Sequence, residues 1–154
     1  MNSSKPRMAP MESLDKIGDN LNPEVHFDQK TGSLSIRGQS IPLNVDAFFV
    51  EVIGWLEQYQ EHPHNPTNLE IDLKYLNGQS IRTLLAILTK MKKINDGGSA
   101  VNVNWTIPDG LMTCSIYERN FWAISIFIIK SSRIKHKVFR IQTCRFVQLS
   151  IFAA

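Results

Sequence analysis

Residues 69–88 read LEIDLKYLNGQSIRTLLAIL and pass from a strand pattern to a helix pattern within a few residues. In the first part, Leu69, Ile71 and Leu73 alternate with charged residues, which predicts a strand with one apolar face. From Ser80 the apolar residues recur at spacings of three and four, which predicts an amphipathic helix over residues 80–94. The stretch therefore predicts a strand that leads directly into a helix.

The flanking sequence completes an α/β pattern. Residues 24–28 and 33–38 are typical of two short strands, and the glycine of QKTG between them favours a hairpin turn. Residues 45–60 have the spacing of an amphipathic helix, and residues 100–105 alternate as a further strand. The order β-β-α-β-α-β predicts an α/β fold: two main amphipathic helices on a small mixed sheet, with a parallel strand pair across the second helix.

The composition is that of a single soluble domain, with 43% hydrophobic and 20% charged residues. The longest apolar run, residues 121–129, is far shorter than the roughly 20 residues of a membrane span, and the first 20 residues lack the apolar core of a signal peptide. We therefore expect a cytoplasmic protein without a membrane partner. Cys114 and Cys144 are interpreted as reduced thiols, and no metal or other cofactor is expected.

The junction after residue 76 is the candidate site, because open α/β sheets carry their sites at the carboxyl ends of strands. Asn77 and Gly78 tolerate left-handed backbone angles, and Ser80 is expected to be the N-cap, accepting from the amide of Arg82 or Thr83. The positive helix end would favour a phosphoryl group or a partner's carboxylate. The alternative is that this sequence serves only to cap the helix.

No pattern in the chain indicates catalysis. The glycine-rich motifs GxGxxG and GxxxxGK[ST] are absent, and neither a carboxylate pair nor a Ser/His/Asp arrangement stands out. We therefore do not expect an enzyme.

Several motifs, taken in order, resemble those of the SiaC family of bacterial regulatory phosphoproteins. The family pattern has an F-D entry, a G-x-S-[YI]-P turn before a helix with F-F…W-L-E, and L-x-Y-L/F-N-T-S-S before the next helix. The matching segments are Phe27-Asp28, GQSIP at 38–42, Phe48-Phe49, WLE at 55–57 and LKYLN at 73–77. The resemblance covers about residues 21–107.

The resemblance implies a non-catalytic switch protein with an architecture like that of anti-sigma-factor antagonists (STAS-like). In such a system a kinase phosphorylates a hydroxyl at the strand-helix junction and a phosphatase removes the group. The unphosphorylated form binds a diguanylate cyclase and promotes cyclic-di-GMP synthesis and biofilm growth. The added charge of about −1.5 to −2 at a partner-facing helix end would oppose docking. The implied partner-binding and phosphoswitch residues are Asn77, Gly78, Gln79, Ser80 and Arg82.

The chain departs from the family pattern at the switch itself. Gly78 stands at the position of the family threonine and Gln79 at that of the next serine, so only Ser80 keeps a hydroxyl. Ser80 is either a displaced phosphosite or, as we favour, the protein stays in an unphosphorylated-like state.

The two ends of the chain differ from the middle. Residues 1–20 are expected to be a mobile leader, and residues 21–110 the SiaC-like domain. Residues 111–154 hold seven of the 17 Lys and Arg residues but one of the 14 acids, mixed with Phe and Ile. This atypical tail suggests, as an alternative function, nucleic-acid binding. We favour a frameshift origin from about residue 112, which sequencing of the coding DNA would test.

Overall fold

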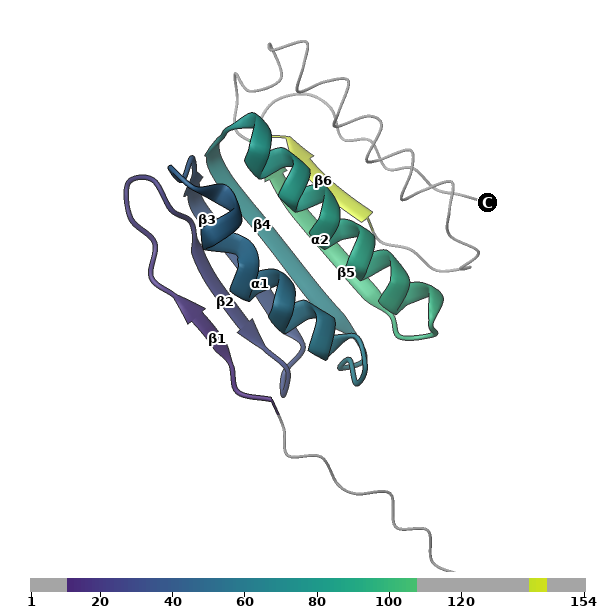
Figure 1. The fold of residues 1–154 in the computed structure, drawn as a ribbon. Helices are drawn as coiled ribbons and strands as arrows, with labels where there is room; N and C mark the ends of the chain where they lie inside the picture. The colour runs from purple at the N-terminus through teal and green to yellow at the C-terminus, as the bar shows by residue number, and fades with distance from the viewer. Residues whose placement is uncertain (1–10, 108–138, 144–154) are drawn as a thin grey trace, which may run out of the picture.

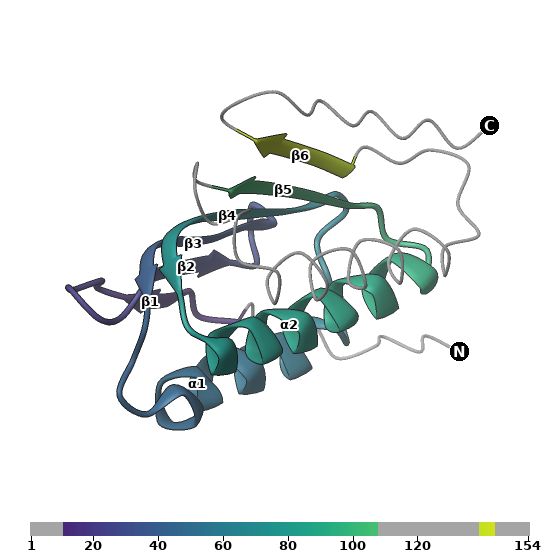
Figure 2. The same ribbon diagram turned by 90° about the horizontal axis from the view of Figure 1, so that it is seen from above.

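Two helices cover one face of a six-stranded mixed sheet in the computed structural model, which describes residues 11–107 and 139–143 (Figure 1). The elements are β1 Leu14–Lys16, β2 Glu24–Asp28, β3 Ser33–Ser40, α1 Val45–Tyr59, β4 Thr67–Leu76, α2 Gly78–Asp96, β5 Val101–Ile107 and β6 Phe139–Thr143. The strands lie side by side in sequence order, and both helices lie on the same side of the sheet (Figure 2). The predicted α/β class and the predicted order of the central elements are confirmed.

The strand directions follow from the connections. β1, β2 and β3 pair antiparallel, while β3, β4, β5 and β6 pair parallel. The β2–β3 turn is the predicted hairpin: Gly32 has a φ of 69°, and its amide donates to the carbonyl of Asp28 at 3.0 Å. The parallel pairs β3–β4 and β4–β5 are connected through α1 and α2, so both helices begin at the same end of the sheet (Figure 1).

The core lies between the helices and the sheet. The apolar face of β4 and the inner faces of both helices are buried, as their spacing predicted. Trp55 widens the inner face of α1, where its ring stacks on Tyr59 at 5.0 Å between centroids. None of the helices in the described part of the chain combines the length and apolar character needed to span a bilayer.

The expectation of a mobile leader over residues 1–20 is wrong for residues 14–16, which form the edge strand β1. The indole N–H of Trp55 donates to the carbonyl of Glu12 at 2.9 Å, and Lys16 forms an ion pair with Glu51 at 2.7 Å. Lys16 also lies 5.1 Å from the ring centroid of Phe48. A strand of three residues is too short to show an alternating pattern, so β1 could not be predicted from the sequence.

The predicted tail contributes one described strand. β6 pairs parallel with β5 from Val103↔Phe139 to Ile107↔Thr143, and so extends the sheet. The remaining residues of the 111–154 segment lie outside the described residues, as does most of the basic surface considered for nucleic acid. The frameshift origin of this segment stays a hypothesis.

Candidate functional site

The strand-helix corner after β4 is built by Asn77, which the sequence analysis did not identify as the cap. Asn77 is extended, with φ −95° and ψ 168°, and its side-chain oxygen accepts from the amide of Ser80 at 2.8 Å. Its own amide donates to the carbonyl of Ser40 at 3.1 Å, which ties the corner to the end of β3. The predicted Ser80 cap is therefore wrong, and α2 begins two residues earlier, at Gly78. Asn and Ser are almost equally good caps, so composition alone did not distinguish them.

We expected left-handed backbone angles at Asn77 and Gly78, but the turn does not use them. Among the described residues, the glycines with positive φ are Gly32, Gly38 and Gly98. A Cβ added to Gly78 would meet no heavy atom within 4 Å. The position of the family threonine therefore has both the space and a backbone conformation for a larger side chain.

Ser80 lies inside the fold. Its side chain is fully buried, and its hydroxyl accepts a 2.9 Å hydrogen bond from the hydroxyl of Ser40. Ser80 is the third residue of α2, on the face that packs against the sheet together with Ile81 and Leu84. The predicted site residue Ser80 is therefore not part of the surface. A phosphate could be added to its hydroxyl only if the corner opened.

The other predicted site residues do form a surface. Gly78, Gln79 and Arg82 are exposed and Asn77 is half-buried, all within the first turns of α2. No residue in the described part of the chain forms an ion pair with Arg82. The first turn of α2 carries no acidic residue, so the partial positive charge of this helix end is not compensated locally.

The side chains of β4 change direction just before the corner, which was not predicted from the sequence. In β4, Leu73 pairs with Gly38 and Tyr75 with the next residue, Gln39, so Lys74 is the extra residue of a β-bulge. After the bulge, Leu76 packs on the core and Tyr75 is 59% exposed. The sequence holds a signal for this, because the inward apolar residues of β4 are two apart up to Leu73 and then three apart, at Leu76.

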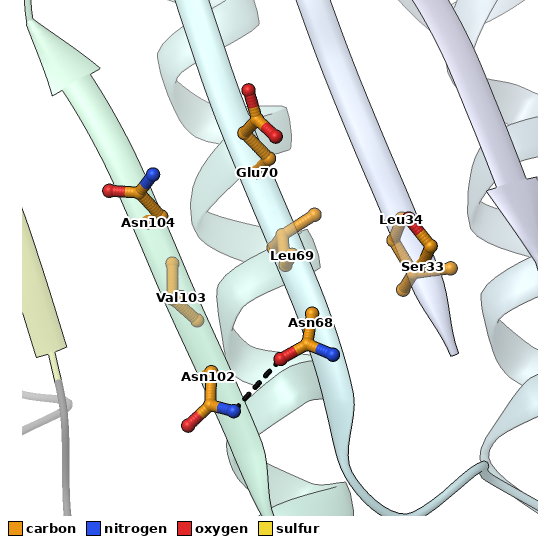
Figure 3. Close-up of a pocket in the computed structure, with 8 residues that line it drawn as sticks. All are labelled: Ser33, Leu34, Asn68, Leu69, Glu70, Asn102, Val103 and Asn104. Atoms are coloured by element: carbon orange, nitrogen blue, oxygen red, sulfur yellow. Dashed lines mark hydrogen bonds between the residues drawn. The ribbon is translucent and has the colours of Figure 1, made fainter. Parts of the chain in front are cut away.

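A shallow depression of about 480 Å³ lies on the sheet face that the helices leave uncovered (Figure 3). The residues that line it are Ser33, Leu34, Asn68, Leu69, Glu70, Asn102, Val103 and Asn104. The side-chain amide of Asn102 donates to the side-chain oxygen of Asn68 at 2.8 Å, and Glu70 forms an ion pair with Arg37 at 3.0 Å. No set of three potential metal-ligating side chains occurs among the described residues. Within the described residues, the lining of the depression therefore does not supply the ligands for a metal ion.

Comparison with protein families shows which family this chain belongs to. The family model described as "SiaC family regulatory phosphoprotein" matches residues 18–121. This chain belongs to the SiaC family. The resemblance inferred from motifs over residues 21–107 is confirmed, and the family match extends it at both ends.

Relatives of the chain support this membership. It is 33% identical over 95 residues to an uncharacterized protein of Pseudomonas aeruginosa strain UCBPP-PA14. The alignment covers 62% of this chain and 75% of that protein. Among solved structures, SiaC of Pseudomonas aeruginosa aligns with a TM-score of 0.65 at 25% identity, over 86% of this chain and 99% of that one. A crystal structure of the diguanylate cyclase SiaD in complex with its activator SiaC, from the same organism, aligns with a TM-score of 0.66 at 26% identity, over 84% and 98% of the two chains.

Proposed function

We propose that this protein is a non-catalytic regulator that binds and activates a diguanylate cyclase, and that the contact surface is the corner formed by Asn77, Gly78, Gln79 and Arg82. The observation that carries the proposal is the exposed helix start of a SiaC-family fold, with a cation and no acid on its first turns. A structural neighbour from the same family is described as the activator of a diguanylate cyclase. Such a regulator acts in the cytoplasm, where cyclic-di-GMP is made.

The corner suits a protein partner better than a reaction. Its exposed groups are an amide, a glycine backbone and a guanidinium, none of which is a nucleophile or a general base. Arg82 and the unoccupied helix N–H groups are instead hydrogen-bond donors that a partner's carboxylate would accept. Binding, rather than catalysis, is the function that these groups support.

We further propose that the phosphoswitch of the family does not operate at this corner. Gly78 has no hydroxyl, and the hydroxyl of Ser80 is buried and bonded to Ser40. The kinase and phosphatase implied by the family resemblance therefore have no exposed hydroxyl between residues 77 and 80 to act on. In this account the chain remains in its cyclase-binding form.

Calorimetric titration with the purified diguanylate cyclase encoded nearest to its gene tests the binding proposal. The wild-type chain should bind and raise cyclic-di-GMP synthesis. Arg82→Glu should weaken binding about tenfold or more, because it places a like charge opposite the partner's carboxylate. The matched control is Lys93→Glu, an exposed charge reversal in the last turn of the same helix, which should bind like wild type. Equal loss in both variants would show that charge at this corner is not special.

The phosphoswitch proposal is tested by co-expressing the protein with a kinase that phosphorylates SiaC-family proteins and then measuring its intact mass. Wild-type protein should gain no phosphate. Gly78→Thr, for which the site has room, should gain one and lose cyclase binding in proportion to its phosphorylation. A phosphate mapped to Ser80 of the wild-type chain would contradict the proposal.

A further inference from the structure

The end of the molecule that holds the corner also gathers exposed apolar side chains. Among the described residues, five large apolar side chains are exposed: Ile17, Leu21, Leu43, Val50 and Tyr75. Ile17 and Leu21 lie in the β1–β2 connection, Leu43 in the β3–α1 connection and Tyr75 next to the last residue of β4. These segments lie at the end of the sheet where both helices begin (Figure 1). We call these four residues, Ile17, Leu21, Leu43 and Tyr75, the end patch.

Backbone hydrogen bonds join the segments that carry the end patch. The amide of Ile41, two residues before Leu43, donates to the carbonyl of Leu21 at 2.9 Å. The end of β3 is in turn tied to the corner through Ser40 and Asn77. The end patch therefore spans the ends of neighbouring strands from β1 to β4, about 14 Å at the usual strand spacing. This width is within the reach of one docked segment.

Two features indicate that this exposure is built into the fold. Leu43 is 92% exposed in the connection that leads into α1. Tyr75 would lie on the buried face of β4 if the alternation continued, and the bulge at Lys74 turns it outward. Buried tyrosines need a partner for the hydroxyl, whereas a tyrosine at a binding surface supplies a large apolar area and a polar tip. Tyrosine and arginine are among the residue types that dominate the binding energy of protein interfaces.

The charges around the end patch define the chemistry of its partner. Lys74 and Arg82 are exposed on either side of the corner, next to a helix start without an acid. Two acids are close in sequence to end-patch residues. Asp46, three residues after Leu43, lies in the first turn of α1 and complements that helix start. Asp19 is occupied within its own loop, because its carboxylate accepts from the side chain of Asn22 and from the amides of Leu21 and Asn22. These hydrogen bonds, that of the Asn22 side chain first, hold the pKa of Asp19 below its usual value.

We propose that the end patch and the corner form one docking surface for an amphipathic segment of the partner protein, with apolar side chains against Leu43 and Tyr75 and a carboxylate against Arg82. The inference rests on the proposed function and adds the chemistry of the segment that the cyclase would present. It also assigns Leu43 and Tyr75, outside the family's switch position, as residues that determine affinity.

Binding of the same purified cyclase to single-site variants tests this surface. Leu43→Ser and Tyr75→Ser should each weaken binding about tenfold or more, and the double variant further. The matched control is Val50→Ser, which removes an exposed apolar side chain from α1 outside the end patch and should change affinity less than about twofold. All three side chains are exposed, so thermal unfolding should stay close to that of wild type.

The outcomes separate this inference from the proposed function. If wild-type protein does not bind the cyclase, the proposed function fails and the inference fails with it. If wild-type protein binds and Arg82→Glu does not, but the Leu43 and Tyr75 variants bind like Val50→Ser, the end patch is not part of the interface. In that case the proposed function stands and this inference is overturned.

Discussion

The two strand-helix junctions within residues 11–107, β3–α1 and β4–α2, use the same cap and differ in charge. Asn44 accepts from the amide of Ala47 at 3.0 Å, and Asn77 accepts from that of Ser80 at 2.8 Å. In α1 the second residue is Asp46, an acid that complements the positive helix end. In α2 the equivalent position is Gln79, and the first turn has no acid.

Good capping therefore does not by itself make a functional site. Both helix starts satisfy the same backbone donor with the same side chain, so both are adequate for stability. Only the β4–α2 junction leaves its helix charge uncompensated and keeps a cation, Arg82, exposed beside it. We interpret the missing acid as the mark of a helix end that meets a partner's carboxylate.

The largest effect on stability is expected at Ser80, which belongs to the second junction but lies inside it. Ser80→Asp would bury a carboxylate beside the hydroxyl of Ser40 with no cation to pair with it, so we expect the free energy of unfolding to fall by about 3 kcal/mol or more. Urea denaturation measures this. Gln79→Asp, one residue earlier and exposed, is the control and should not destabilise the protein. A stable Ser80→Asp variant would mean that the hydroxyl is accessible.

A charge at Gly78 should separate binding from stability. Gly78→Asp places a carboxylate at the first position of α2, where it would stabilise the helix but repel the partner's acid. We expect cyclase binding to weaken about tenfold, close to 1.4 kcal/mol, while thermal stability holds or rises slightly. Ala100→Asp, at the opposite end of the sheet, is the control for added charge and should bind normally. Loss of binding in both would argue against a localised surface.

The two caps should be equivalent in a stability measurement. Asn44→Ala and Asn77→Ala each remove one acceptor from a helix start, so each should cost about 1 kcal/mol of unfolding free energy. Chemical denaturation of the two variants gives the comparison directly. A cost at Asn44 with none at Asn77 would show that the second junction is held in another way.

The smallest effect concerns the equivalent second positions of the two helices. Asp46→Asn should destabilise the protein by about 0.5 kcal/mol, and Gln79→Asp should stabilise it by about the same amount, because the two exchanges remove and add the same helix-end interaction. Both differences should shrink as salt is raised. If Gln79→Asp gained nothing, the helix end of α2 would not be electropositive.

Much of this fold follows from the sequence, because its signals are local. The alternation in β4 and the three-and-four spacing in α2 predicted the elements and their buried faces, and the glycine at position 32 predicted the hairpin. The order of motifs from Phe27 to Asn77 was enough to predict the family, which the comparison confirmed.

The features that the sequence did not reveal depend on tertiary context. β1 is too short to show a period, and it is held by contacts to α1 such as that of Lys16 with Glu51. The choice of Asn77 over Ser80 as the cap depends on where β4 stops pairing with β3, at Leu76. Burial of Ser80 then follows, because the earlier start includes Ser80 in the helix, four residues before Leu84 on the face that packs against the sheet. The edge strand β1, the cap at Asn77 and the burial of Ser80 are therefore the features that required the structure.

Hydrogen–deuterium exchange of the protein, alone and with the cyclase, is the decisive test that the start of α2 is the contact surface. The first amides of α2, at Gly78 and Gln79, have no partner within the helix and should exchange quickly in the free protein. We expect the cyclase to slow exchange in the peptide covering residues 78–82 and to leave residues 90–98, which include the far end of α2, unchanged. Binding that leaves residues 78–82 unaffected, or that slows only the far end, would contradict it.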